Sequence, residues 1–414
     1  MNKIKQFIYD NWDGTLRFEP NDQEKLIGMP YPYTVPCIKD KFNELYYWDT
    51  YFTNVGLILS DKVDYAKNNT SDIAYLINRY GYMPNGNRFH YLSRSQPPFF
   101  TAMVRDVFEK TRDTAWLSEM YEAGKREYDF WQTKRMTPSG LNRYYYNEDV
   151  PVDLQQSAEY YCKRLNIDVP TDEADVRRYG IANRTVCESG WDCNSRFGIC
   201  RNTEYNWIDL NCLLFGMERD MAGFAEILEN GEEQTWTERA EARREKLNAL
   251  CWNDKVGAFC DYDFVNGKVS DFVSAASFYA MFVGLCTEEQ AASTVKLIEK
   301  LEQPHGLACC EPRDDLLDLQ WDYPHGWACL HYVAIAGLLR YGYSDIAKRL
   351  AVKYCNTVER NFEKTGNIWE KYNMVTGEVS TTKEGAHQIT MMGWSAGIYL
   401  YCTTLCDRQI DVYR

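Results

Sequence analysis

The sequence lacks long apolar runs, because no stretch of eighteen consecutive apolar residues occurs in its 414 residues. We therefore expect no membrane-spanning helix. The amino terminus, MNKIKQFIYDNWDG, has no apolar core of the kind that signal peptides contain, so we expect no secretory signal.

Positive charge is also in deficit, since 46 Lys and Arg against 60 Asp and Glu leave a net charge of −14. Nucleic acids and anionic membranes would be repelled and are not expected as partners.

Metal-binding patterns are missing as well. Only five histidines occur, and no two have the spacing of a helical metal site. The fifteen cysteines contain no Cys-x-x-Cys, and the adjacent Cys309 and Cys310 suit neither zinc nor an easy disulfide. We expect no metal and no cofactor. Reduced thiols packed as small apolar side chains are the simpler interpretation, and with them a cytoplasmic location.

The pattern that is present is helical nearly throughout. Apolar residues recur at spacings of three and four, and Asp113 and Ser344 are candidate helix caps. The clearest segments are 54–81, 113–134, 207–229, 232–252, 287–302 and 343–366. One β-hairpin is predicted around Asn266–Gly267.

No low-complexity linker divides the chain, so residues 1–414 are predicted to form a single domain. A polar stretch at about 148–178 has weak periodicity. Such a stretch is either an inserted lid or a long solvated connection, and the sequence leaves both open.

Polar and aromatic residues gather in the segments that join the helices. These segments are 41–52, 81–100, 187–197, 320–327, 367–373 and 383–394. The motif QWDYPHGW at 320–327 places indoles and a carboxylate before an ordinary helix, which indicates a pocket for a flat, hydroxylated ligand. Loops on a rigid scaffold are the usual place for catalysis.

The same segments resemble the trehalase family of glycoside hydrolases (family 37). YYWDTYF and QWDYPHGW are similar to its two signatures, and PNGNRFHYLSRSQPP, ESGWD and EKYN resemble three further blocks in the same order, over about residues 28–406. The resemblance implies an all-α fold, an (α/α)6 toroid of paired helices. It also implies inverting hydrolysis of an α-glucosidic bond, with α,α-trehalose as the expected small glycoside substrate.

The resemblance further implies site residues. Asp192 would be the general acid and Glu370 the general base. Breaking an acetal needs a proton for the leaving oxygen and an activated water, and inversion needs the two carboxyl groups roughly 6.5–9.5 Å apart. On the residues alone Asp49 or Asp322 could also be the acid, but we expect them to bind a sugar hydroxyl or fix a loop. The expected substrate-binding set is Lys41, Phe42, Trp48, Asp49, Asn85, Arg88, Arg94, Gln96, Gly190, Trp321, Asp322 and Glu384.

Two departures from the family pattern keep other substrates open. Lys41 stands where the family has arginine, and its Arg-Pro-Glu block is not found between Asn142 and Val186. A related toroid hydrolase acting on another α-glucoside or α-mannoside, such as glucosylglycerate, mannosylglycerate or a kojibiose-like sugar, is the alternative. An inactive sugar-binding protein on the same fold is the rival from another class.

Overall fold

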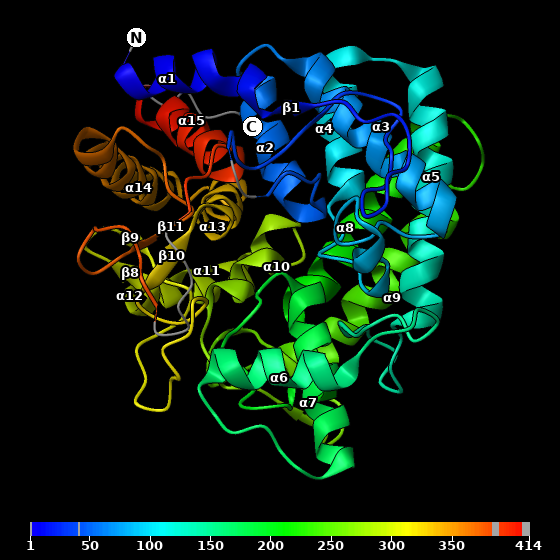
Figure 1. Cartoon of the computed structure of the whole chain (residues 1–414), viewed down its shortest axis with the longest axis vertical. Coiled ribbons are helices and arrows are strands. Elements are labelled where there is room, and N and C mark those ends of the chain that lie inside the picture. Colours follow the sequence, from blue (N-terminus) through cyan, green and yellow to red (C-terminus); the bar gives the residue numbers. More distant parts are fainter. Residues whose placement is uncertain (1, 40–41, 383–388, 408–414) are drawn as a thin grey trace.

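The computed structural model describes residues 2–39, 42–382 and 389–407, and in them the chain is mainly helical (Figure 1). Strands are two or three residues long and lie in the connections. They are β1 (Leu16–Arg17), β2 (Tyr33–Thr34), β3 (Tyr205–Asn206), β4 (Trp252–Asn253), β5 (Ala258–Phe259), β6 (Tyr262–Asp263), β7 (Lys268–Val269), β8 (Glu302–Gln303), β9 (Gly306–Leu307), β10 (His325–Trp327) and β11 (Lys371–Asn373). The predicted all-α class is confirmed.

A closed ring of inner helices forms the centre of the fold. Each contacts the next, and the last contacts the first. In ring order they are α2 (Tyr47–Leu59), α4 (Phe100–Thr111), α8 (Ile208–Ile227), α10 (Phe278–Phe282), α13 (Ala328–Arg340) and α15 (Gly393–Asp407). Helices α2 and α13 are buried on nearly every side, as expected for helices enclosed by other helices.

Outer helices cover this ring and complete an (α/α)6 toroid. They are α1 (Lys3–Asn11), α3 (Val63–Tyr80), α5 (Thr114–Lys134), α9 (Glu233–Cys251), α11 (Glu288–Thr294) with α12 (Ile298–Leu301), and α14 (Ser344–Thr365). The first and last helices meet, because the Asn2 side chain donates a 2.6 Å hydrogen bond to Tyr399 of α15 (Figure 1). Helices α1 and α15 thus lie side by side.

A close helix contact joins α15 to α2 at a pair of glycines. A Cβ on Gly56 would lie 2.4 Å from the Cα of Gly397, and a Cβ on Gly397 would lie 2.4 Å from the carbonyl oxygen of Phe52. Any side chain at either position would therefore separate the two helices. Glycine is required here for the close approach of two backbones.

Local signals in the sequence mostly match the structure. Asp113 caps α5 by accepting a hydrogen bond from the backbone N–H of Trp116, and β6 pairs with β7 around Asn266–Gly267 as predicted. The predicted cap at Ser344 is wrong, because Ser344 is the first helical residue of α14 and Tyr343 holds the cap position without a side-chain bond. One position of shift is typical of helix ends.

The polar stretch 148–178 is largely helical. It contains α6 (Leu154–Leu165) and the first turns of α7 (Glu173–Ser189), which pack tightly against each other. A Cβ on Gly180 of α7 would lie 2.3 Å from the carbonyl oxygen of Leu154. In Figure 1 the two helices lie outside the inner ring, near the bottom of the view.

Candidate active site

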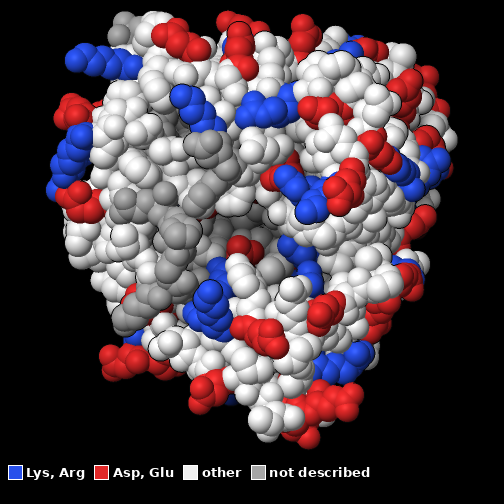
Figure 2. Space-filling view, in the orientation of Figure 1, with Lys and Arg blue, Asp and Glu red and all other residues white. Residues whose placement is uncertain are grey.

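A cavity of about 800 Å³ opens where inner helices α2, α13 and α15 begin. All six polar-aromatic segments contribute to its wall. Their lining residues are Phe42, Tyr46, Trp48, Asp49, Asn85, His90, Tyr91, Arg94, Gln96, Cys187, Gly190, Asp192, Gln320, Trp321, Trp327, Glu370, Lys371, Ile389, Met391 and Trp394. Figure 2 shows the hollow, with basic side chains at its rim and an acidic one in its depth. The volume is typical of small-molecule sites.

Packed indoles form one wall of the cavity. Trp321 and Trp327 are stacked, with ring centroids 4.0 Å apart and an angle of 1° between the rings. Trp48 lies 5.6 Å from Trp321 and 5.5 Å from Trp394, centroid to centroid. These tryptophans are core residues and pocket-lining residues at once, since each is nearly buried yet contributes to the cavity wall. They give the pocket a rigid apolar face.

The strand pair β10–β11 positions Glu370. Trp327 is the register partner of Lys371, so the residue just before Lys371 is held beside the indole wall. The ammonium of Lys371 donates a 2.7 Å hydrogen bond to the Glu370 carboxylate, and both side chains are largely buried. Burial raises the pKa of Glu370, and the charge of Lys371 opposes this rise.

Asp192 lies in the loop that follows α7. The helix ends at Gly190, whose φ of 71° favours glycine, and a Cβ there would lie 2.7 Å from the Trp48 indole. The Asp192 side chain is 43% exposed and lines the cavity, with Nη1 of Arg164 at 3.9 Å. Surrounding protein nevertheless raises the pKa of Asp192 through burial, against the charges of Arg164 and Arg94.

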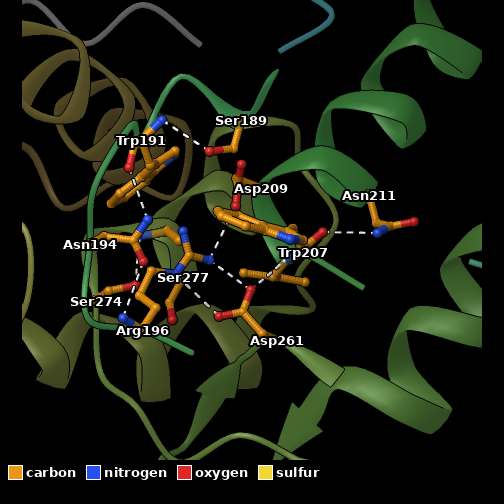
Figure 3. A network of polar contacts seen from close by, with 12 residues as sticks. Ser189, Trp191, Asn194, Arg196, Trp207, Asp209, Asn211, Asp261, Ser274 and Ser277 are labelled. Carbon is orange, nitrogen blue, oxygen red and sulfur yellow. Dashed lines mark hydrogen bonds and ion pairs between the residues drawn. The ribbon is translucent and has the colours of Figure 1, made fainter. Parts of the chain in front are cut away.

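A buried ionic network fixes the loop that carries Asp192 (Figure 3). Arg196 donates to Asp261 at 2.6 Å and to Asp209 at 3.1 Å, and all three side chains are almost fully buried. The Arg196 guanidinium also lies 4.6 Å from the Trp191 ring. Because Trp191 directly precedes Asp192, the network holds the carboxyl-bearing loop against the toroid.

A second buried ion pair anchors the start of the same motif, and the sequence reasoning missed it. Glu188 is fully buried and accepts two hydrogen bonds from Arg135, at 2.7 and 2.8 Å. It also accepts from the backbone N–H groups of Ser95 and Tyr145. Glu188 therefore ties α7 to the segment that contains Arg94. The only signal in the sequence was its place in the motif ESGWD.

Asp49 is the third carboxyl group of the cavity. It lies in the first turn of α2, where the helix dipole favours an anion. Burial outweighs this and raises the pKa of Asp49 to about 8, with further contributions from the charges of Glu370 and Asp192. Asp49 is therefore largely protonated at neutral pH, next to the other two carboxyl groups.

Most predicted substrate-binding residues line the cavity. These are Phe42, Trp48, Asp49, Asn85, Arg94, Gln96, Gly190 and Trp321. Arg88 is absent from the cavity wall and pairs instead with the buried Glu44. Lys41 and Glu384 lie outside the described residues.

Asp322 also differs from the expectation of a sugar contact. It is buried and lies outside the cavity wall. Its carboxylate accepts from the hydroxyl of Ser195 at 2.6 Å and from the backbone N–H of Ser195 at 2.8 Å. The residue thus fixes the loop that follows Asp192, which is the other role that the sequence allowed.

The sequence reasoning also missed a wall built by α6 and α7. Its residues are Gln156, Ser157, Tyr160, Lys163, Arg164, Asn183 and Arg184. No motif marked them, since they lie in or after the polar stretch with weak periodicity.

A helical toroid whose pocket combines stacked indoles with three carboxyl groups defines a glycoside hydrolase. The chain belongs to the trehalase family, whose sequence profile matches residues 8–407. A periplasmic trehalase of Xanthomonas campestris pv. campestris (strain B100) is 31% identical over 97% of this chain and 73% of that protein. A periplasmic trehalase of Salmonella newport (strain SL254) is likewise 31% identical, over 96% and 72%.

Solved structures agree in fold. The neutral trehalase of Saccharomyces cerevisiae superposes with a TM-score of 0.78 and 29% identity, over 97% of this chain and 80% of that one. The GH63 mannosylglycerate hydrolase of Thermus thermophilus has a TM-score of 0.67 over 97% of this chain and 100% of that one. At 17% identity, the second likeness shows the fold alone.

The expected cytoplasmic location is wrong, because the curated relatives are periplasmic trehalases by name. In the described residues no disulfide joins any of the fifteen cysteines, and all except Cys187 and Cys406 are buried. Burial limits the access of oxidants to most of these thiols in any compartment, so the absence of a disulfide does not report location. No helix in the described part of the chain is long and apolar enough to span a membrane.

Proposed function

We propose that this protein hydrolyses α,α-trehalose to two glucose molecules with inversion at the attacked carbon. The observation that supports this most directly is the convergence of all six family-like segments on one cavity that contains Asp192 and Glu370. Relatives that are 31% identical are trehalases by name. In this proposal the whole chain is one catalytic domain, and the α6–α7 hairpin is an insertion at the mouth of its pocket.

Asp192 and Glu370 divide the chemistry between them. Asp192 donates its proton to the glycosidic oxygen as the bond to the anomeric carbon breaks. Glu370 accepts a proton from the water that attacks the opposite face of that carbon. The raised pKa of Asp192 favours its protonated form, and the Lys371 ammonium favours the anion of Glu370.

Asp49 has a binding role in this scheme. With a pKa of about 8 it keeps its proton at neutral pH and can donate a hydrogen bond to a sugar hydroxyl. A neutral Asp49 also avoids a third negative charge beside Asp192 and Glu370. The indole wall of Trp48, Trp321 and Trp327 then packs against the apolar face of the sugar.

The test is proton NMR of the anomeric signals during the first minutes of trehalose cleavage. Inversion releases one β-glucose from the attacked ring and one α-glucose from the leaving group of each trehalose. Two α-glucose molecules at the outset would contradict the assignment of Glu370 as base. No glucose release, with the protein shown to be folded, would contradict the proposed function.

A further inference from the structure

One side of helix α6 lines the cavity, although no motif in the sequence marked it. The cavity residues of this helix are Gln156, Ser157, Tyr160, Lys163 and Arg164. The other four lie three or four positions from Tyr160, so all five share one side of the helix. Ala158, Tyr161 and Cys162 are buried instead, and α6 packs against α7. The helix therefore presents a continuous strip of side chains to the pocket.

Tyr160 is the exposed aromatic residue of this strip. It is 52% exposed, whereas the tryptophans of the indole wall are at most 4% exposed. Of the Phe, Tyr and Trp residues that line the cavity within the described ranges, only Tyr160 is exposed. An exposed tyrosine is ordinary on an outer surface, as Tyr31 at 46% shows. Tyr160 differs because it belongs to the wall of a cavity, where a ligand can cover its ring.

Arg164 connects Tyr160 to the proposed general acid. Its guanidinium carbon lies over the Tyr160 ring, 5.7 Å from the ring centre. Its Nη1 lies 3.9 Å from Oδ2 of Asp192, and its side chain is only 11% exposed. The guanidinium thus covers one face of the ring and leaves the exposed area on the other. Tyr160 and Asp192 are separated by the width of this one group.

A second, smaller hydrophobic cluster holds Tyr160 and Asp192 in a fixed relation. It contains Tyr161, directly after Tyr160, and Cys193, directly after Asp192. Its other buried members are Ala182, Val186, Cys200 and Leu319. Because the neighbours of both residues share one packed core, the ring and the carboxyl group stay on the same side of the cavity. This is the leaving-group side, since Asp192 protonates the leaving oxygen in the proposed mechanism.

The cavity has room beyond two sugar rings. Its volume of about 800 Å³ lies in the upper part of the range of about 300–1,000 Å³ for small-molecule sites. In the proposed mechanism the attacked ring packs against the indole wall, and the leaving ring lies next to Asp192. Tyr160 is then placed beyond the leaving ring, towards the solvent.

Polar groups for a further sugar surround Tyr160. Gln156 and Lys163 are exposed, lie on the same strip and can donate hydrogen bonds. Asn183 of α7 also lines the cavity and is 4% exposed. Its buried Oδ1 has no hydrogen-bond partner among the described residues, which is unusual for a buried polar atom. A sugar hydroxyl could satisfy it.

We propose that Tyr160 forms an outer subsite, which binds a third pyranose ring attached to the leaving group of an α-glucoside. This inference rests on the proposed function and extends its substrate class to trisaccharides. The flat faces of tyrosine and of a pyranose ring both carry apolar surface, which stacking removes from water. The outer ring is bound equally before and during the chemical step, so it should lower KM and leave kcat unchanged.

The test compares trehalose with the two trisaccharides that carry a further α-glucose on O4 or on O6 of one ring. Attack by water on the unsubstituted ring releases β-glucose, and the leaving group departs as α-maltose or α-isomaltose. Proton NMR of the anomeric signals identifies both products at the outset. We expect this product pair from at least one trisaccharide, with a KM that is ~5-fold or more below that of trehalose.

Variants locate the outer subsite. Tyr160→Ala should raise the KM of the trisaccharide relative to that of trehalose by ~5-fold or more, because the stacking surface is lost. Tyr160→Phe keeps the ring and should keep the wild-type ratio of the two KM values. Tyr31→Ala is the matched control, because Tyr31 is similarly exposed but absent from the cavity wall.

The outcomes separate this inference from the proposed function. If trehalose is cleaved but neither trisaccharide is, or if the KM of neither is lower, the outer subsite is refuted and the proposed function stands. Release of α-glucose with a β-disaccharide would refute it too, because the substituted ring would then be the attacked one. So would equal KM ratios for Tyr160→Ala and Tyr31→Ala. If the folded protein releases glucose from none of the three sugars, both proposals fail.

Discussion

Trp327 and Lys371 face each other across the short antiparallel pair β10–β11, and the Lys371 ammonium lies 4.9 Å from the centre of a Trp327 ring. The same ammonium donates to Glu370. One lysine thereby connects the indole wall to the proposed general base. Since Lys371 is only 3% exposed, its charge acts on Glu370 with little screening by water.

Removal of this lysine should therefore change the pH dependence of catalysis. The Lys371 charge opposes the rise in the pKa of Glu370, so Lys371→Met should raise that pKa further. Glu370 works as the anion, so the acidic limb of kcat/KM against pH should move to higher pH. Lys364→Met is the control, because Lys364 pairs with the exposed Glu378. An unmoved acidic limb would exclude Glu370 as the group that titrates there.

Substitution of the two proposed catalytic carboxyls should affect turnover more than binding. Asp192→Asn and Glu370→Gln keep the shape of each side chain but remove its proton chemistry, so kcat should fall ~10²–10⁴-fold. KM should change little, because both amides still form hydrogen bonds. Glu44→Gln serves as a control, since Glu44 pairs with Arg88 outside the cavity wall. The measurement is steady-state kinetics on trehalose. An Asp192→Asn variant that keeps its turnover would show that Asp192 is not the general acid.

Asp322→Asn should lower stability rather than the rate of the chemical step. The carboxylate accepts charge-assisted hydrogen bonds from Ser195 and from the backbone N–H of Leu319 while buried. Their loss should cost about 1–3 kcal/mol in the free energy of unfolding, measured with urea. Ser195→Ala, which removes one of the donors, should cost less. If the Asp322→Asn protein were stable but had no turnover, Asp322 would take part in the chemical step instead.

Gly190→Ala should impair the pocket through a direct clash. The new Cβ would lie 2.7 Å from the Trp48 indole, so Trp48 must shift in the wall next to Asp192. Gly198→Ala is a closely matched control, because Gly198 has nearly the same φ, 67° against 71°, and no atom within 4 Å of its Cβ position. Both variants carry the backbone strain of about 1 kcal/mol, but only Gly190→Ala should also lower kcat/KM. Equal activities would show that Trp48 does not need its present position.

Glu127→Gln tests a buried carboxyl away from the pocket. Glu127 is fully buried, and burial raises its pKa from 4.5 to about 8. The folded state then holds a proton that the unfolded state releases between these values. Its contribution to stability is fully present below about pH 4.5 and is lost as the pH rises to about 8.

Urea unfolding of the wild type and of Glu127→Gln across this pH range provides the measurement. The wild type should lose stability relative to the variant as the pH rises. Glu238→Gln, at an exposed position of α9, should follow the wild type at every pH. Parallel curves for wild type and Glu127→Gln would mean that Glu127 ionises normally in the folded protein.

The sequence by itself determined the local features of this protein. Helical periodicity identified helices such as α5 and α9, Asp113 capped one of them as predicted, and Asn266–Gly267 formed its hairpin. These features depend on residues close together in the chain, so a single sequence contains them. The six polar-aromatic segments could likewise be named, because their composition differs from that of the helices.

Only the tertiary structure decided which of these segments meet, and which residues face the cavity. Arg88 and Asp322 have side chains suited to sugar binding, but Glu44 and Ser195 engage them outside the pocket wall. Arg184 had no motif, yet the packing of α6 on α7 places it in the wall. Both results depend on contacts between distant parts of the chain, which periodicity does not record. The pKa of Asp49 follows the same rule, because burial is a property of the assembled toroid.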